Sequence, residues 1–336
     1  MDKQNKIPIL RSIKLAVGYN CNLNCGFCLQ QRSNKSPILD FDLFKKIMQE
    51  KMVKEDVKLI TLTGGEPTYG PYLDLSLKIT KYAHDLGKEI CIFTNGVLLD
   101  EHMLKSFKEA GLTRFRISLY DPIDWDKTRD LMRRLKSFGF PTMVKYTVTR
   151  ENFSQIENIL KNIPKTGVDW FQIKPYNRVE VPETDKKYEL HPDQVLFMAK
   201  LLLKFRKQFP EIKTDLLPLC YEFLVEDGLP MEELSPCNCG KGPFGYLVIG
   251  PTGDVRICGA YPKPIGNIKS DTITGLWKNH PLLNQVRNLA NRPKPKECQK
   301  CTHWQKCART DCHSATFAKY GSYEHGNPQC PLLAKK

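Results

Sequence analysis

Three cysteines near the N-terminus have the spacing of metal ligands. Cys21, Cys25 and Cys28 form a C-x3-C-x2-C pattern after a short apolar run at 13–17, which predicts a loop leaving a first strand. Three thiolates cannot complete a tetrahedral structural zinc site, and they leave one iron of a four-iron, four-sulfur (4Fe-4S) cube without a protein ligand. An open iron can bind and reduce a substrate or cofactor. For such spacings alone, the alternative is a redox pair or half of a zinc knuckle.

A glycine-rich stretch follows the second predicted strand, at Gly64, Gly65, Glu66 and Pro67. The two glycines allow backbone conformations and close approaches that a Cβ would block, leaving amides and carbonyls for a ligand. An ordinary tight loop is the alternative if this stretch is taken alone.

The first half of the chain alternates strand and helix signals. Six strands, each followed by a connection long enough for a helix, require right-handed crossovers and therefore a parallel sheet. The expected fold class is α/β, a partial (β/α)6 TIM-like barrel with a C-terminal cysteine-rich cluster-binding domain. Its chemistry should collect on the loops after the strands. The predicted strands are 13–17, 58–63, 89–94, 114–119, 142–148 and 169–174, and the predicted helices are one from Asp40 onward, 74–86, 101–110, 126–138 and 153–163.

Composition defines three regions and a compartment. The 336 residues, 41% hydrophobic and 26% charged, suit one large domain and a smaller one. The barrel should occupy 1–177, and a linker with a helix at 195–208, leading out of the barrel, should occupy 178–236. A cysteine-rich domain should occupy 237–336. With no membrane span and no signal peptide, the protein is expected in the cytoplasm, where its 13 cysteines act as ligands rather than disulfides.

The charge balance is basic, with 51 Lys and Arg against 37 Asp and Glu, a formal net charge of +14. The excess is spread along the chain, as on a solvated surface, and no RNA-binding signature accompanies it. We therefore expect neither nucleic acid nor a membrane as a partner.

The cysteine-rich region has a chain of short spacings. A C-x13-G-x4-C pattern begins at Cys239, and a C-x2-C-x5-C pattern begins at Cys298. Because C-x2-C pairs are common in zinc-binding domains, a pair of zinc sites is the alternative to iron-sulfur clusters. Cys91, inside the apolar third strand, is expected to be a buried core thiol. The candidate ligands of the region are Cys237, Cys239, Cys258, Cys298, Cys301, Cys307, Cys312 and Cys330.

Together these motifs resemble the radical S-adenosylmethionine (SAM) superfamily. The resemblance implies that Cys21, Cys25 and Cys28 hold a 4Fe-4S cluster whose open iron binds SAM. The Gly64–Pro67 loop would bind the amino group of SAM. It also implies further cofactor contacts: Phe27 near the adenine, with Ser118, Arg129, Asn152 and Lys174 on later strand ends and helices. Thr94-Asn95-Gly96 resembles a turn common in the family, or is an ordinary Asn-Gly turn. Asp121 lies with Ser118 at the end of the fourth predicted strand, where relatives place a polar contact to the cofactor. Family members often have Asp-Gly in this turn, and Tyr120-Asp121 departs from that pattern.

The C-terminal framework resembles the SPASM domain, including Gly266-Asn267-Ile268 and Leu276-Trp277 between its halves. That resemblance implies two auxiliary 4Fe-4S clusters. The first would use Cys239, Cys258 and Cys312, and the second Cys298, Cys301, Cys307 and Cys330. The gap before Cys312 is one residue longer than usual. The fourth ligand of the first cluster is Cys237 or Cys220, with Cys237 preferred, or that cluster has an open iron.

The resemblance implies an enzyme, a radical SAM oxidoreductase or maturase. It would cleave SAM reductively to a 5′-deoxyadenosyl radical, abstract a substrate hydrogen, and use the auxiliary clusters for electron transfer or substrate binding. Reduced flavodoxin or ferredoxin would donate electrons. The preferred substrate is a peptide or protein. The alternatives are oxidation or decarboxylation of a small molecule, such as a tetrapyrrole or sugar, and a non-enzymatic zinc or nucleic-acid-binding module.

Overall fold

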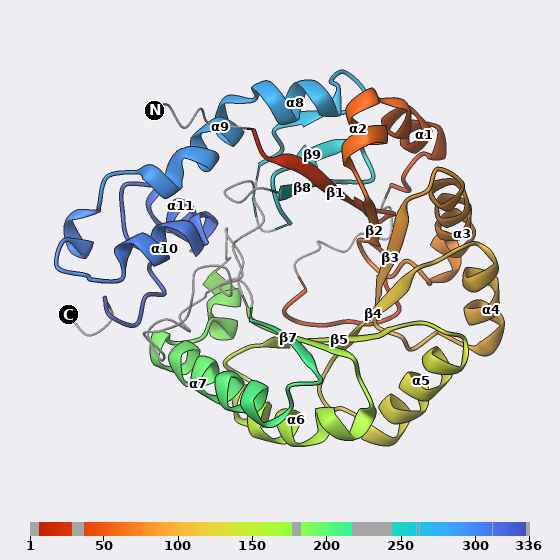
Figure 1. The fold of residues 1–336 in the computed structure, drawn as a ribbon, viewed down its shortest axis with the longest axis horizontal. Coiled ribbons are helices and arrows are strands. Elements are labelled where there is room, and N and C mark those ends of the chain that lie inside the picture. Colours follow the sequence, from red (N-terminus) through yellow and green to blue (C-terminus); the bar gives the residue numbers. More distant parts are fainter. Residues whose placement is uncertain are drawn as a thin grey trace. The chain divides into compact units, whose positions relative to one another are not determined.

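The computed structural model describes residues 7–28, 37–176, 183–216, 244–259, 261, 263–310 and 312–333. The chain divides into two compact units, each built from two separate segments. Unit 1 contains Met1–Phe115 and Asn238–Asn288, and unit 2 contains Arg116–Cys237 and Leu289–Lys336. Figure 1 shows the elements of both units coloured along the sequence.

The sheet of unit 1 is mainly parallel. In it β1 lies between β2 and β8, β3 follows β2, and these four strands run in the same direction. Figure 1 shows the late β8 beside the early β1. Beyond β8 the sheet continues antiparallel through β9 to β10. The bounds are β1 Ile9–Ala16, β2 Leu59–Thr63, β3 Glu89–Thr94, β8 Phe244–Ile249, β9 Asp254–Arg256 and β10 Gly266–Asn267.

Helices with one apolar face connect the strands of unit 1. In α1 the residues Leu43, Phe44, Ile47 and Met48 are buried at helical spacing, and the Asp40 side chain caps the helix by accepting a hydrogen bond from the backbone of the first turn. Burial of this stripe against the sheet supplies most of the helix's stability. The helices are α1 Phe41–Gln49, α2 Lys51–Asp56, α3 Gly70–Asp85, α4 Glu101–Glu109, α8 Ile273–Asn279 and α9 Pro281–Asn288.

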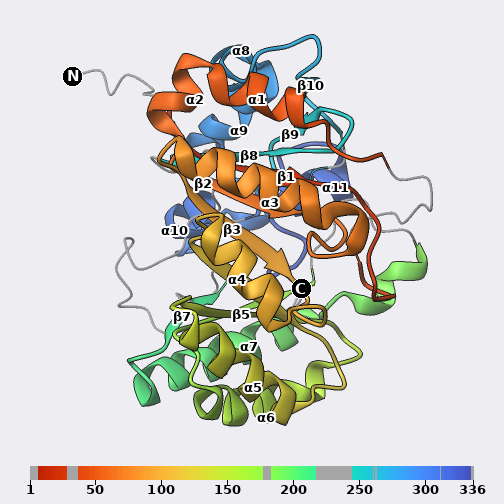
Figure 2. The same cartoon turned by 90° about the vertical axis from the view of Figure 1, so that its right-hand side faces the viewer.

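The C-terminal segment of unit 1 is attached to the N-terminal one by specific contacts. The carboxylate of Glu50 accepts hydrogen bonds from the backbone N–H groups of Ile273 and Thr274, at 2.8 and 2.9 Å, where α8 begins. The buried Trp277 donates through Nε1 to the carbonyl of Pro8 at 2.8 Å, and the guanidinium of Arg287 lies 4.5 Å from the centre of its ring. Figure 2 shows α8 beside α2.

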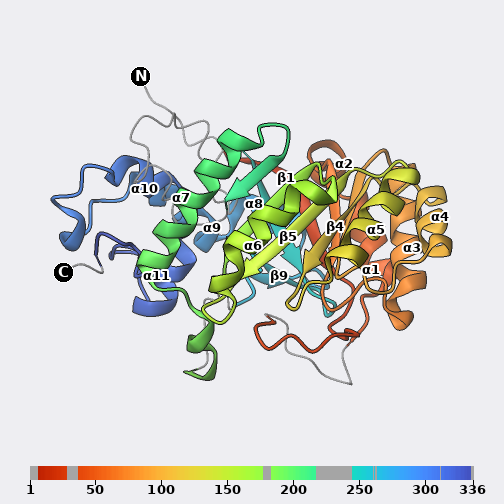
Figure 3. The same ribbon diagram turned by 90° about the horizontal axis from the view of Figure 1, so that it is seen from below.

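Unit 2 continues the alternation of strands and helices. Strand β4 (Arg114–Leu119) begins in the last residues of unit 1, and β5, β6 and β7 run parallel to one another. Figure 3 shows α6 and α7 side by side along these strands. The other bounds are α5 Trp125–Ser137, β5 Thr142–Val148, α6 Ile156–Asn162, β6 Trp170–Pro175, α7 Pro192–Gln208 and β7 Lys213–Leu216.

Short helices make up the rest of unit 2. Three of them, η6, α10 and α11, carry or adjoin predicted cluster ligands. The bounds are η1 Phe153–Gln155, η2 Ile163–Thr166, η3 Glu183–Tyr188, η5 Leu289–Asn291, η6 Lys296–Cys298, α10 Trp304–Thr310 and α11 His313–Tyr320.

The mostly parallel α/β fold is confirmed, and three predicted strands, β3, β4 and β5, have the predicted bounds. Three strands, β7, β8 and β9, were missed. The predicted exit helix is α7, but it leads to β7, which extends the parallel run beside β6. The apolar segment at β8 returns to pair with β1, although residues 237–336 were predicted to form a separate domain. The division into two units follows different boundaries from the predicted domains, and the domain boundaries remain a prediction.

No described helix combines the length and the apolar character needed to cross a membrane.

Candidate functional site

The three N-terminal cysteines lie on the loop after β1, as predicted. All three are half-buried, and the backbone N–H of Cys28 donates to the carbonyl of Cys25 at 3.1 Å, forming a turn. The Cys21 sulfur accepts a hydrogen bond from the backbone N–H of Leu23 at 3.4 Å. Phe27, the predicted adenine contact, is half-buried in the same loop. N–H groups directed at a ligand sulfur suit a thiolate bound to a cluster, so the loop fits such a group.

The glycine-rich loop after β2 lies directly against the cysteine loop. The N–H of Gly65 donates to the carbonyl of Gly18 at 2.8 Å, and the N–H of Glu66 donates to the carbonyl of Asn20 at 2.9 Å. Gly64 has φ +118°, and a Cβ at Gly65 would lie 1.8 Å from the Asn20 oxygen. Glycine is required at both positions because any side chain would separate the two loops.

Glu66 is buried, with 1% of its surface exposed, and both oxygens of its carboxylate accept hydrogen bonds. One oxygen accepts from the N–H and hydroxyl of Thr68, at 3.1 and 2.7 Å. The other accepts from the N–H of Asn95, at 2.8 Å. The described partners of Glu66 therefore belong to its own loop and to the turn after β3, so this carboxylate organises the loop. Beside it, the Ser76 hydroxyl donates to the carbonyl of Pro67 at 2.9 Å.

Tyr72 of α3 contacts the cysteine loop through its ring and its hydroxyl group. Its ring is buried, and its hydroxyl oxygen accepts from the N–H of Asn20 at 3.0 Å. A Cβ at Gly18 would lie 2.4 Å from the ring. Tyr72 could not be identified from the sequence, because a tyrosine in an amphipathic helix gives the same signal as any core aromatic residue.

The remaining predicted cofactor contacts lie in unit 2. Ser118 is half-buried on β4, and Lys174 is half-buried on β6. Arg129 lies on α5, where it forms an ion pair with Asp126 one turn earlier. Their part in cofactor binding stays a prediction.

Asn152 belongs to a network around Asp121. The Asp121 carboxylate oxygen accepts from the Tyr146 hydroxyl at 2.6 Å and from the Asn152 amide at 2.9 Å. The Asn152 oxygen in turn accepts from the N–H of Thr149 at 2.7 Å. Burial of Tyr146, together with its hydrogen bond to Asp121, raises the pKa of its hydroxyl far above the usual value. The network thus joins the loops after β4 and β5.

A cavity of about 540 Å³ opens beside this network, between the start of α5 and α6. It combines two carboxylates with amides and apolar side chains. It is lined by Asp121, Pro122, Ile123, Trp125, Glu151, Asn152, Gln155, Asn158 and Ile159.

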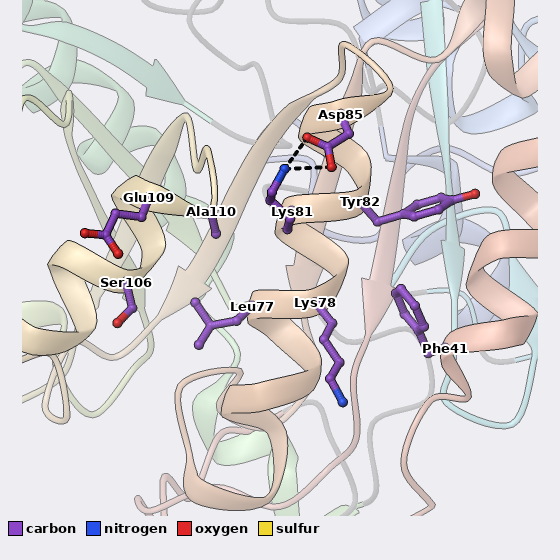
Figure 4. A pocket seen from close by; sticks show the side chains of 9 residues that line it. All are labelled: Phe41, Leu77, Lys78, Lys81, Tyr82, Asp85, Ser106, Glu109 and Ala110. Carbon is purple, nitrogen blue, oxygen red and sulfur yellow. Dashed lines mark hydrogen bonds and ion pairs between the residues drawn. The ribbon is translucent and has the colours of Figure 1, made fainter.

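A second cavity of about 540 Å³ lies on the helical layer of unit 1, between α1, α3 and α4. Figure 4 shows Lys81 bonded to Asp85 along α3, with Phe41 and Tyr82 facing each other on the other side. None of the predicted site residues lines it.

Three of the four ligands predicted for the second auxiliary cluster lie close together in unit 2. Cys298 is buried, and burial raises its pKa to about 11, with further contributions from the charges of Glu297, Cys330 and Cys301. The N–H of Cys301 donates to the carbonyl of Cys298 at 2.8 Å. A Cβ at Gly326 would lie 2.7 Å from the Cys298 sulfur. A buried thiol with a raised pKa becomes a thiolate when a metal binds it.

The other predicted ligands are scattered or lie outside the described residues. Cys307 lies on α10, and the buried Cys312 precedes α11. Cys258 is buried in unit 1. Cys220, Cys237 and Cys239 lie outside the described residues. Cys91 is a buried core thiol of β3, as predicted.

Among the residues that the structure describes, no three His, Cys, Asp or Glu side chains are placed to hold a single metal ion. A 4Fe-4S cube binds its thiolates on separate irons, so it holds them farther apart than one ion does.

Comparison with known families agrees with these two cysteine regions. The Radical SAM superfamily matches residues 15–163, and the chain belongs to this superfamily. A second family, the SPASM iron-sulfur cluster-binding domain, matches residues 237–302. The chain is therefore a radical SAM enzyme with a C-terminal SPASM domain.

Relatives match nearly the whole chain. The AdoMet-dependent heme synthase of Methanosarcina barkeri is 24% identical over 354 residues, covering 96% of each chain. The PqqA peptide cyclase of Gluconobacter oxydans is 23% identical over 340 residues, covering 96% of this chain and 90% of the relative. The crystal structure of Streptococcus suis SuiB bound to its precursor peptide SuiA has the same fold, with a TM-score of 0.74 at 18% identity, covering 98% of this chain and 77% of SuiB.

Proposed function

We propose that this radical SAM enzyme modifies a peptide or protein. The observation that carries the enzymatic part is the contact between the two loops of unit 1, where Gly65 and Glu66 donate to carbonyls of the cysteine loop. The peptide substrate is supported by a SPASM domain and by relatives named for peptides, the PqqA peptide cyclase and SuiB with bound SuiA.

The residues of unit 1 prepare the reacting site. Cys21, Cys25 and Cys28 would hold the cluster, and the Glu66 carboxylate connects the glycine loop with the turn after β3. When bound, the cluster would supply the electron for reductive cleavage of SAM, and the resulting 5′-deoxyadenosyl radical would abstract hydrogen from the substrate. Burial of the supporting groups fixes the loops before SAM arrives, which lowers the entropy cost of binding.

We extend the proposal to three clusters per chain, one binding SAM and two auxiliary. Its support is the grouping of Cys298, Cys301 and Cys330 together with the SPASM match. Separate replacements of Cys237 and Cys220 by alanine, followed by iron analysis and electron paramagnetic resonance (EPR), test the fourth ligand of the first auxiliary cluster. Loss of that cluster only from Cys220→Ala would reverse our preference for Cys237.

The proposal also includes an electron donor and a cellular compartment. A reduced flavodoxin or ferredoxin would donate electrons, and the cytoplasm would keep the thiols reduced.

A small molecule is the second candidate substrate. The observation that favours it is the match over 96% of the chain to an AdoMet-dependent heme synthase. A tetrapyrrole would be its substrate class.

The test uses the anaerobically reconstituted protein with SAM and dithionite. One set of reactions receives synthetic peptides encoded by short open reading frames beside the gene, and the other receives iron tetrapyrroles. We expect a peptide to stimulate formation of 5′-deoxyadenosine and to change in mass. Stimulation by a tetrapyrrole alone would favour the second candidate, and no SAM cleavage under any condition would overturn both.

A further inference from the structure

Asn95, in the turn after β3, reaches the cysteine loop with its side-chain amide. Its Nδ2 lies 2.8 Å from the Asn22 oxygen and 3.8 Å from the Cys21 sulfur. Its Oδ1 accepts from the N–H of Val97 at 2.9 Å, which fixes the orientation of the amide. The donating end of the amide therefore faces the cysteine loop.

Hydrogen bonds also hold the backbone of the turn that contains Asn95. The Asn95 N–H donates to the buried carboxylate of Glu66 at 2.8 Å. The N–H of Gly96 donates to the Thr94 hydroxyl at 3.0 Å, and Gly96 has φ +75°. Asn95 thus connects the glycine loop, by its backbone, with the cysteine loop, by its side chain.

A donor at this position affects a bound cluster through its charge. Reduction adds one electron to the cluster, and N–H groups bonded to its ligand sulfurs stabilise the more negative, reduced form. The Cys21 sulfur accepts from the N–H of Leu23 and from the amide of Asn95. The first donor belongs to the backbone, whereas the second can be removed by mutation.

We propose that Asn95 is a positioning residue that raises the reduction potential of the SAM-binding cluster by donating an N–H···S hydrogen bond to Cys21. The inference rests on the proposed function, because it assumes that Cys21, Cys25 and Cys28 hold this cluster. Asn95 would make reduction by the donor protein easier, and its link to Glu66 would couple the potential to the glycine loop.

The experiment compares two variants with a control, after anaerobic reconstitution of the full chain. Asn95→Ala removes the donor, and Asn95→Asp keeps the size and the acceptor for Val97 while replacing the donor by a negative charge. Thr94→Val, the control, removes a hydrogen bond of the same turn without touching the sulfur. A redox titration followed by EPR measures the midpoint potential of the signal that changes when SAM is added.

We expect the midpoint to become more negative in Asn95→Ala, to shift further in Asn95→Asp, and to stay unchanged in Thr94→Val. A tenfold smaller ratio of reduced to oxidised cluster at a fixed potential corresponds to about 59 mV for one electron. Unchanged midpoints in both Asn95 variants would overturn the inference. Loss of the cluster from both would also overturn it, in favour of a purely structural turn. If the wild-type protein takes up no SAM-responsive cluster, the proposed function itself fails.

Discussion

The carboxylate of Glu66 accepts a 2.8 Å hydrogen bond from the backbone N–H of Asn95, although the two residues follow different strands. The same carboxylate holds Thr68 with its other oxygen. A buried carboxylate with charge-assisted bonds to two loops fixes their relative positions.

Replacing Glu66 by glutamine should loosen this connection. The amide NH2 of glutamine would face either the Asn95 N–H or the Thr68 donors, leaving a buried donor without its acceptor at a cost of roughly 1–3 kcal/mol. We expect a lower unfolding temperature and weaker SAM binding, measured by thermal denaturation and isothermal titration calorimetry. Wild-type stability in Glu66→Gln would contradict the role assigned to this carboxylate.

A methyl group at Gly65 should separate the two loops. Its Cβ would lie 1.8 Å from the Asn20 oxygen, so the backbone must move. We expect Gly65→Ala to lose the SAM-responsive cluster and SAM cleavage, measured by EPR and by 5′-deoxyadenosine formation. Gly70→Ala is the matched control, because a Cβ there meets nothing within 4 Å. Similar loss in both variants would point to a general folding defect.

Replacing Cys25 by alanine should abolish SAM cleavage while most of the auxiliary iron remains bound. The reason is that Cys298, Cys301 and Cys330 belong to a different unit from the N-terminal cysteines. Iron analysis and 5′-deoxyadenosine formation under dithionite measure the two effects. The control is Cys91→Ala, which should keep all the iron and lose about 1 kcal/mol of stability by removing a buried group. Normal cleavage by Cys25→Ala would refute the ligand assignment.

The hydrogen bond between Tyr146 and Asp121 should make stability depend on alkaline pH. Burial first, and then Asp121, raises the pKa of Tyr146 in the folded protein, so the folded state keeps the proton after the unfolded chain has lost it. The contribution to stability is complete below the ordinary tyrosine pKa of about 10 and declines as the pH rises above it.

Urea denaturation of the metal-free protein at pH 8 and at pH 10.5 tests this dependence. Tyr146→Phe should lose about 1 kcal/mol at pH 8, the typical net value of one hydrogen bond. It should also lose less stability than the wild type between the two pH values. Equal losses in both proteins would show that Tyr146 is not the responsible group.

The sequence predicted most of the barrel elements because their signals are local. Amphipathic periodicity and the capping residue Asp40 mark helices, and three strands were predicted with their observed bounds. Pairing partners are not local, so the place of β8 beside β1 was missed, since an apolar segment does not encode which strand it joins.

The same limit applies to the site. The cysteine pattern and the two glycines identified the two loops because their spacing is constrained by the chemistry. The contacts of Tyr72 and Asn95 with the cysteine loop depend on tertiary packing, and their sequence signals are those of a core aromatic residue and an ordinary turn. An Asn-Gly pair directly after a strand whose neighbour carries the glycine loop was the one available hint.

The pairing of β1 with β8 has a consequence for biosynthesis. Strand β2, one neighbour of β1, is synthesised soon after it. The other neighbour, β8, is complete only when the ribosome has reached Ile249. While the ribosome makes the intervening chain, β1 is an open edge, and the cysteine loop at its end is attached to a half-built sheet. If iron and sulfide were delivered before β8 is made, the cysteine loop would not yet be held by a complete sheet. We therefore expect the cluster to be assembled after β8 has been translated.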